Sequence, residues 1–373
     1  MIKNFDYLRI LKPIKNKLEK RFSSVLSSGN LILGPNVKKF EKDFSKYLGT
    51  KYGLGVGNCT DAIFIALKAF DIGPGDEVIT VSNTAIPTIT AIVNTGASPV
   101  FVDVDKDYLI NVDLIKKKIN KKTKAILPVH LYGKVCNMKE ILRISKQYNL
   151  KVVEDSAQAT GSSFNGKKAG SIGDIGCHSF YPTKILGGVG DGGFISTNNK
   201  NLYIKMKKIR FMGIDSNQNS NNYLNYYNAN IHGTNSRLDE IQASLLSVKL
   251  NQLSLYTKTR KKNAKLYDHY LKDLNLDLPE KNSNTVLYEY VVRHKKRNQI
   301  LDYLKNKNIF LKITYPIPIH KMKPYKKYFH KNLDLRNTEK FAKEIFSLPV
   351  YPGIKLTEIK KICKNLRDAL IKE

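Results

Sequence analysis

The stretch Ser179-Phe180-Tyr181-Pro182-Thr183-Lys184-Ile185-Leu186-Gly187-Gly188 decides how this chain is interpreted. It holds one lysine, preceded by a hydroxyl group five residues earlier and followed by a glycine-rich exit that continues to Gly193. A lysine amine suits covalent attachment to a carbonyl compound when it follows a strand and when glycine lets another molecule approach the backbone closely. We therefore predict that Lys184 is a catalytic lysine that forms a Schiff base.

The residues before this stretch alternate between short apolar strands and amphipathic helices. That pattern is typical of an α/β fold with a mostly parallel sheet covered by helices. Ligands bind such sheets at the carboxyl ends of the strands, where Gly57, Asn83, His130 and Asp155 should converge on one crevice. His130, at another strand end, is interpreted as a histidine satisfied by hydrogen bonds. The strands are expected at 52–56, 77–81, 99–103, 125–129, 152–154, 177–181 and 193–197, and the helices between them at 60–70, 86–94, 113–120 and 138–147.

Asp155 ends one of these strands and is the first candidate partner for Lys184. A buried carboxylate is costly without a cationic partner, and the protonated pyridine nitrogen of pyridoxal phosphate (PLP) would be such a partner. Because side chains alternate along a strand, the rival acid Glu154 should face the other way. Gln158 would then lie beside the ring and could bond its phenolic oxygen. Together, Lys184 and Asp155 predict PLP as the cofactor.

The turn Gly57-Asn58-Cys59-Thr60-Asp61 is the candidate phosphate site, because it joins a strand to a helix. Backbone amides and the Thr60 hydroxyl at a helix N-terminus bind phosphate readily. A plain N-cap is the alternative interpretation of the same residues. Ser179 adds a second hydroxyl group. A phosphate beside Asp61 requires that the backbone, and not the carboxylate of Asp61, faces it.

The chain is expected to form a large domain over residues 1–250 and a small α+β domain over residues 251–373. The asparagine-rich residues 206–235 are interpreted as a long loop, mobile or lent to a neighbouring subunit. In the small domain, Tyr315-Pro316-Ile317-Pro318-Ile319-His320 is a rigid segment suited to holding His320 over a cleft, with a structural loop as the alternative. From residue 238 onward, helices are expected at 238–250, 257–271, 297–307, 337–346 and 356–371, and strands at 286–293 and 309–314.

The formal net charge of +31 is the most unusual property of the composition. The lysines are scattered along the chain, and neither zinc-finger spacing nor an RNA-binding aromatic signature occurs, so we predict a solvated basic surface rather than nucleic-acid binding. Such a field would still favour an anionic small substrate. The four cysteines form no CxxC pair and are expected to be free and mostly buried, and no metal site is predicted.

The sequence also bears on where the protein works. No apolar run approaches the ~20 residues that a membrane span requires. The N-terminal residues lack the apolar core of a signal peptide. We therefore expect no membrane association and a cytoplasmic location.

With these residues assembled, the chain resembles the sugar aminotransferases of the DegT/DnrJ/EryC1/StrS family. The resemblance spans nearly the whole chain and depends on many motifs in a fixed order. It implies the type I fold of PLP-dependent transferases, similar to aspartate aminotransferase. Beyond the two stretches quoted above, the matching motifs are Leu33-Gly34-Pro35, Pro99-Val100-Phe101-Val102-Asp103-Val104, Pro128-Val129-His130-Leu131-Tyr132-Gly133, Glu154-Asp155-Ser156-Ala157-Gln158, Gly190-Asp191-Gly192-Gly193, Gly233-Thr234-Asn235-Ser236-Arg237-Leu238 and Ile241-Gln242-Ala243.

The resemblance implies a role for each candidate residue. Lys184 would bind the cofactor covalently and move a proton, Asp155 would pair with the pyridinium nitrogen, and Gln158 would touch the ring oxygen. Family members that act as dehydratases carry histidine in place of this lysine, so Lys184 favours transamination. Ala85 stands where many members have an aromatic ring that stacks on PLP. The resemblance further assigns the phosphate to Thr60, Asp61, Ser179 and, from the other subunit of a homodimer, Asn235, and the substrate to Tyr181, Tyr315 and His320.

The resemblance also implies the reaction. Asn83-Thr84-Ala85-Ile86-Pro87-Thr88 and the Tyr315–His320 segment are similar to members that aminate C3 of a dTDP-linked keto-sugar, although Thr314 stands where these members usually have histidine. We expect amination of a nucleotide-linked 3-keto-6-deoxyhexose by L-glutamate, through the pyridoxamine form of the cofactor. The alternative is a C4 aminotransferase acting on a UDP-, GDP- or dTDP-linked 4-keto-6-deoxyhexose. Two alternatives that are not enzymes are a PLP-binding regulator and a sugar-nucleotide binding protein that does not use PLP.

Overall fold

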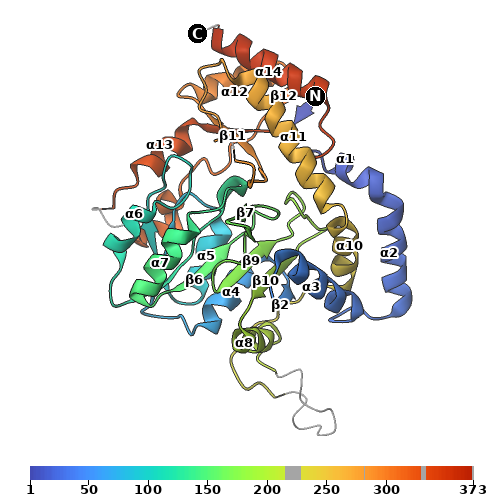
Figure 1. Cartoon of the computed structure of the whole chain (residues 1–373), viewed down its shortest axis with the longest axis vertical. Helices are drawn as coiled ribbons and strands as arrows, with labels where there is room; N and C mark the ends of the chain where they lie inside the picture. The colour runs from blue at the N-terminus through green and yellow to red at the C-terminus, as the bar shows by residue number, and fades with distance from the viewer. Residues whose placement is uncertain (215–227, 281, 329–332, 372–373) are drawn as a thin grey trace.

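A central sheet of seven strands organises the structure (Figure 1). The computed structural model describes residues 1–214, 228–280, 282–328 and 333–371. The strands lie in the order β2-β10-β9-β6-β5-β3-β4, and β10 is the strand that runs antiparallel to its neighbours. The mostly parallel sheet is therefore confirmed. Its strands are β2 Tyr52–Val56, β3 Glu77–Val81, β4 Ser98–Val102, β5 Thr123–Ile126, β6 Lys151–Asp155, β9 Ile175–Ser179 and β10 Gly193–Thr197.

Helices cover both faces of this sheet because successive side chains of a strand point to opposite faces. In β10, Ile195 belongs to the apolar cluster that contains Ile63 of α4 (Cys59–Ala69). Its neighbour Phe194 instead packs with Phe40 of α3 (Pro35–Leu48). Both faces are thus buried, as parallel sheets require. The remaining helices of this part are α1 Tyr7–Leu11, α2 Lys15–Ser28, α5 Ile86–Asn94, α6 Val112–Ile115, α7 Met138–Tyr148, α8 Lys200–Arg210 and α10 Glu240–Leu250.

A second apolar core lies in the C-terminal part, reached through the long helix α11 (Leu253–Leu271). The chain's start belongs to it, because β1 (Ile2–Lys3) pairs in parallel with β12 (Ile309–Phe310) and Ile2 is buried there. Figure 1 accordingly draws both termini at the same end of the molecule. The domain division at residue 250 stays a prediction. The other elements are β11 Tyr290–Arg293, α12 Arg297–Asn306, α13 Arg336–Glu344, β13 Ile345–Leu348 and α14 Leu356–Ile371, with a small hairpin of β7 Ser163–Phe164 and β8 Lys167–Lys168 in the large part.

Two predicted segments are corrected by the structure. The expected loop 206–235 begins as helix, because α8 continues to Arg210, whose guanidinium donates to Glu41 Oε1 at 2.6 Å and to the Gly55 carbonyl oxygen at 2.8 Å. The middle of that loop, 215–227, lies outside the described residues. The helix expected at 337–346 ends at Glu344, and the four residues that follow are buried and pair with β11.

The strands expected at 286–293 and 309–314 are confirmed only as the shorter β11 and β12. The four cysteines are free and buried, as expected. Among the residues described, no helix combines the length and the apolar character that a membrane span requires.

Candidate active site

Three charged residues of the predicted site, Asp155, Asp61 and Lys184, act on one atom, the Cys59 thiol at the start of α4. This thiol is buried, which raises its pKa well above the ordinary value. Asp155 and Asp61 raise the pKa further, and Lys184 lowers it. All three charged groups are therefore within electrostatic reach of a single sulfur atom, at the carboxyl ends of β2, β6 and β9.

Asp155 occupies the last position of β6 and is only 5% exposed. Its Oδ2 accepts a hydrogen bond from Thr88 Oγ1 at 2.8 Å, and its Oδ1 accepts one from the Ala157 backbone N–H at 3.1 Å. Within the described ranges, no lysine, arginine or histidine forms an ion pair with it. An ionised carboxylate this deep is stable only beside a positive charge, so the site fits a cationic ring nitrogen.

Glu154 faces away from the crevice, as the strand alternation predicts. Its carboxylate meets His130 Nε2 at 2.8 Å and accepts backbone N–H groups of residues 170, 172 and 173. The Cys136 N–H donates to Nδ1 of His130 at 3.2 Å. His130 is thus fully buried and satisfied by hydrogen bonds, as interpreted from the sequence. Because its ring pairs with Glu154, the prediction that His130 converges on the crevice is wrong.

Lys184 lies in the turn after β9, where its backbone N–H donates to the Tyr181 carbonyl oxygen at 2.8 Å. Its Nζ lies 4.8 Å from the ring centroid of Tyr288, whose hydroxyl pairs with Thr183 Oγ1 at 2.9 Å. No acidic group of the described chain lies within 4 Å of this amine. The amine is therefore left available for a ligand. A Cβ on Gly187 would lie 2.2 Å from the Pro182 carbonyl oxygen, which explains the glycine-rich exit.

The turn before α4 has the predicted position and an N-cap that sequence reasoning did not assign. Asn58 Oδ1 accepts the Asp61 N–H at 2.9 Å, and its Nδ2 donates to Asp61 Oδ2 at 3.0 Å. Ser236 Oγ donates to the same carboxylate at 2.7 Å and accepts the Gly57 N–H at 3.0 Å. The carboxylate of Asp61 is thereby engaged with its own turn, and the Thr60 hydroxyl stays partly exposed. The N-cap is thus Asn58, one of the residues for which an N-cap was the alternative interpretation. Ser236 was missed because its contact joins parts of the chain that are 175 residues apart.

Gln158 and Tyr315 meet, although 157 residues separate them. Gln158 Nε2 donates to the Tyr315 hydroxyl at 2.7 Å, while its Oε1 accepts the Tyr132 N–H at 2.7 Å. Tyr315 adopts a left-handed backbone with φ of 62°, which is uncommon for a residue other than glycine. Burial raises the pKa of the Tyr315 hydroxyl, and Tyr288, Glu289 and Asp155 raise it further.

Both ring nitrogens of His320 have hydrogen-bond partners, so the ring is not left free over a cleft as the sequence predicted. Its Nδ1 lies 2.7 Å from Ser82 Oγ, its Nε2 lies 3.1 Å from Glu339 Oε1, and its backbone N–H donates to Ser82 Oγ at 3.0 Å. The ring is 2% exposed. It therefore fixes the end of β3, next to Asn83, whose Nδ2 is buried without an acceptor in the described part of the chain.

The remaining candidate residues, Ser179, Ala85, Tyr181 and Asn235, differ in exposure and keep their proposed roles as predictions. Ser179 Oγ accepts the Tyr181 N–H at 3.2 Å. Ala85 caps α5 and is partly exposed. Tyr181 is 53% exposed, and Asn235 is exposed on this single chain.

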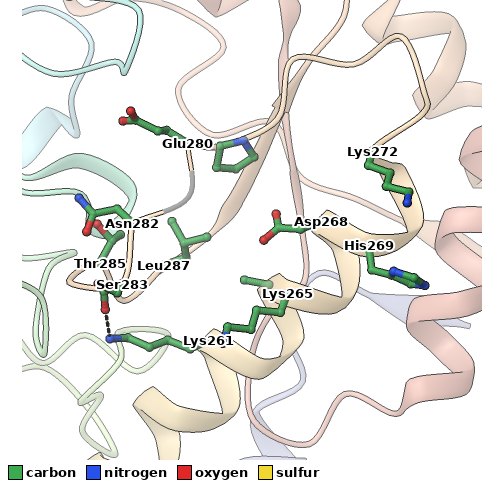
Figure 2. Close-up of a pocket in the computed structure, with 12 residues that line it drawn as sticks. Lys261, Lys265, Asp268, His269, Lys272, Glu280, Asn282, Ser283, Thr285 and Leu287 are labelled. Carbon is green, nitrogen blue, oxygen red and sulfur yellow. Dashed lines mark hydrogen bonds between the residues drawn. The ribbon is translucent and has the colours of Figure 1, made fainter.

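A separate pocket lies outside this crevice. It has a volume of about 530 Å³, lies between α11 and residues 279–287, and contains none of the predicted site residues (Figure 2). Lys261 reaches across its floor to the Ser283 carbonyl oxygen at 2.5 Å. The chemistry predicted for Lys184 and Asp155 has no counterpart there.

Comparison with known proteins identifies the family. The model of the DegT/DnrJ/EryC1/StrS aminotransferase family matches residues 12–367. The chain belongs to this family. It is an α/β aminotransferase with PLP as its cofactor, and the expected fold class is confirmed.

Individual relatives agree with the family assignment. The dTDP-3-amino-3,4,6-trideoxy-alpha-D-glucose transaminase of Micromonospora megalomicea subsp. nigra is 40% identical over 98% of this chain and 96% of its own length. The dTDP-3-amino-3,6-dideoxy-alpha-D-galactopyranose transaminase of Aneurinibacillus thermoaerophilus is 40% identical over 97% and 98%. A protein of Geobacillus stearothermophilus named pleiotropic regulatory protein is also 40% identical, over 96% and 95%. The crystal structure of NtdA from Bacillus subtilis with bound cofactor PMP has a TM-score of 0.91 at 31% identity, covering 100% of this chain and 86% of NtdA.

The described residues fit this cofactor. Asp155 offers a buried carboxylate without a cation, Lys184 offers an amine without an acid, and the turn before α4 offers a helix N-terminus. These are the groups that a pyridinium nitrogen, an aldehyde and a phosphate require, respectively.

Proposed function

We propose that this aminotransferase transfers an amino group from L-glutamate to C3 of a dTDP-linked 3-keto-6-deoxyhexose. The observation that supports transamination is the amine of Lys184, which has no acidic partner within 4 Å in the described chain and acts, like the buried carboxylate of Asp155, on the Cys59 thiol. The printed names of the two dTDP-3-amino sugar transaminases support position C3 and the dTDP group. The basic surface is compatible with an anionic sugar nucleotide.

The proposed mechanism assigns one task to each side chain. When bound, PLP supplies an electron-withdrawing ring that stabilises negative charge on the carbon next to the transferred nitrogen. Asp155, fixed by Thr88, keeps the ring nitrogen protonated through its carboxylate oxygen. Lys184 holds the cofactor in the resting enzyme and afterwards carries the proton between the two reacting carbons as general base and acid. Gln158 donates its Nε2 hydrogen toward the ring oxygen and is held in position by the Tyr132 N–H.

The remaining assignments are also proposals. Thr60, Asp61 through its backbone, and Ser179 bind the phosphate together with Asn235 of the partner subunit in a homodimer. Ala85 faces the ring. Tyr181 and Tyr315 contact the substrate. His320, which is bonded to Ser82, instead positions the residues at the end of β3. Residues 1–250 and 251–373 are the proposed domains.

The visible spectrum of the purified protein tests the reaction class. We expect an absorption band of the protein-bound cofactor that excess L-glutamate bleaches. The variant Lys184→Ala should bind the cofactor without the bleaching step. A band that glutamate leaves unchanged would contradict L-glutamate as donor, and the lack of any band after adding PLP would contradict the assignment of this site.

Product analysis tests the sugar. NMR of the product formed from a dTDP-linked 3-keto-6-deoxyhexose should place the nitrogen on C3. An amine on C4, from a 4-keto sugar, would establish the alternative C4 aminotransferase instead.

A further inference from the structure

A half-exposed lysine, Lys312, lies beside the proposed active site and has no role in the mechanism above. It follows β12, and its backbone carbonyl oxygen accepts the Ser347 N–H of β13 at 2.8 Å, which fixes this part of the chain. Its side chain is 48% exposed, and its Nζ donates to Glu289 Oε1 at 2.9 Å. The ammonium group is thus fixed by Glu289 while about half of the side chain stays open to solvent.

Glu289 is the hub of this arrangement. The residue is 5% exposed, and its Oε2 accepts a hydrogen bond from Ser347 Oγ at 2.6 Å and another from the Thr314 hydroxyl. Residues 312 and 314 are two positions apart, and both reach the same carboxylate. Thr314 directly precedes Tyr315, whose hydroxyl accepts a hydrogen bond from Gln158 Nε2 at 2.7 Å, so this carboxylate is joined to the segment that carries a proposed site residue.

Lys312 is protonated and has hydrogen-bond donors that the described chain does not use. Burial opposes its ionisation, but Glu289 and Tyr288, and more weakly Tyr181, raise the pKa of Lys312 above its ordinary value. The amine therefore stays protonated at neutral pH. An ammonium has three N–H donors, and in the described part of the chain one acceptor, Glu289, is provided for it. Two donors therefore remain for a ligand.

We propose that Lys312 is a specificity-determining residue that binds an anionic oxygen of a substrate at the mouth of the Lys184 site. The inference deepens the proposed function and rests on it. The ligand chemistry is a carboxylate or a phosphate. The amino donor would supply the carboxylate, and the nucleotide sugar would supply the phosphate. Glu289 acts as the positioning residue that holds the ammonium at the mouth without neutralising its remaining donors.

The first experiment measures the donor half-reaction from the cofactor spectrum at increasing concentrations of L-glutamate. Loss of a charge-assisted hydrogen bond in Lys312→Gln should raise the half-saturating concentration by about 10-fold or more, with the limiting rate changed by less than about twofold. Lys312→Arg should restore most of the loss. Lys305→Gln, which removes an exposed lysine of α12, is the matched control for the general loss of positive charge.

The second experiment separates the two sources of the anion by calorimetry with dTDP, UDP and the corresponding nucleosides, on the cofactor-loaded protein. If the phosphate is the ligand, Lys312→Gln should weaken the diphosphates by about 10-fold and leave the nucleosides unchanged. If the carboxylate is the ligand, only the glutamate response should weaken. The wild-type response to glutamate tests the proposed function separately, since only the difference between wild type and variant concerns Lys312. Equal affinities of Lys312→Gln and Lys305→Gln for glutamate and for both diphosphates would overturn the proposal.

Discussion

At the scale of single residues, the hydrogen bond from Thr88 to Asp155 gives the sharpest prediction about the cofactor. Thr88→Val keeps the shape of the side chain and removes the donor that orients the carboxylate. We expect the dissociation constant for PLP to rise by about 10-fold, since a hydrogen bond to a charged group contributes roughly 1.5–3 kcal/mol. Thr90→Val is the control, because Thr90 Oγ1 lies 2.9 Å from the Tyr325 hydroxyl and does not contact Asp155. Fluorescence titration with PLP measures both, and equal constants would contradict the role given to Thr88.

A second residue, His178, predicts how stability depends on pH. It is fully buried, and burial lowers its pKa to about 4 from the ordinary 6.5. Between pH 6.5 and pH 4 the imidazole of His178 is therefore protonated in the unfolded chain and neutral in the folded chain. The free energy of unfolding consequently decreases as the pH falls through this range, by about 3 kcal/mol at most. Urea unfolding of the protein without added cofactor should show that His178→Asn loses less stability than wild type over this range. Parallel curves for the two proteins would contradict the prediction.

Some of the site residues could be predicted from the sequence because their chemistry is rare at such positions. Asp155 ends a strand and Lys184 follows one, and their proposed partners in catalysis belong to the cofactor rather than to the protein. Thr88, Tyr288 and Ser236 could not be predicted, because each acts through a contact between distant parts of the chain. A threonine or serine gives no signal until its acceptor is known.

At the scale of elements, the contact between β10 and the turn before α4 determines the shape of the phosphate site. A Cβ on Gly193 would lie 2.4 Å from the carbonyl carbon of Asn58. Gly193→Ala must therefore push the turn away from the strand, and we expect a loss of about 1–3 kcal/mol in the free energy of unfolding together with weaker PLP binding. Gly73→Ala, whose Cβ would meet an ordinary contact at 3.5 Å, is the control and should change neither quantity. Intact PLP binding in Gly193→Ala would contradict the proposed phosphate site.

The elements of the sheet were easier to predict than those at its borders. Buried parallel strands are short apolar runs, so β2, β3 and β10 begin and end at the expected residues. The N-terminal half of α8 was not assigned, and its C-terminal half was read as loop, because its lysines and the asparagines that follow obscure the helical period. β13 continues directly from α13, and no turn residue marks the change from helix to strand.

At the scale of the whole molecule, the exposed position of Asn235 bears on the proposed dimer. The residue forms an isolated bridge with Phe211, at the base of the segment that precedes it. Its neighbour Ser236 is 2% exposed and bonds Asp61 of the same chain. The backbone is thus fixed to the turn before α4 of its own chain, while the side chain of Asn235 is exposed, which is compatible with the proposed entry into the site of a partner.

A mixed dimer tests this arrangement. Lys184→Ala lacks the reactive amine, and Asn235→Asp sets a negative charge against the phosphate, so each variant alone should fail in the donor half-reaction. In a dimer of one chain of each kind, one site would combine the Lys184 of one chain with the Asn235 of the other and would be complete. Co-expression with two different tags should then restore about a quarter of the wild-type activity, if chains pair at random in a symmetric dimer. Had Asn235 served its own chain's site, every site would carry one of the two changes. Mixing would then restore nothing, and the proposal that subunits share their active sites would be wrong.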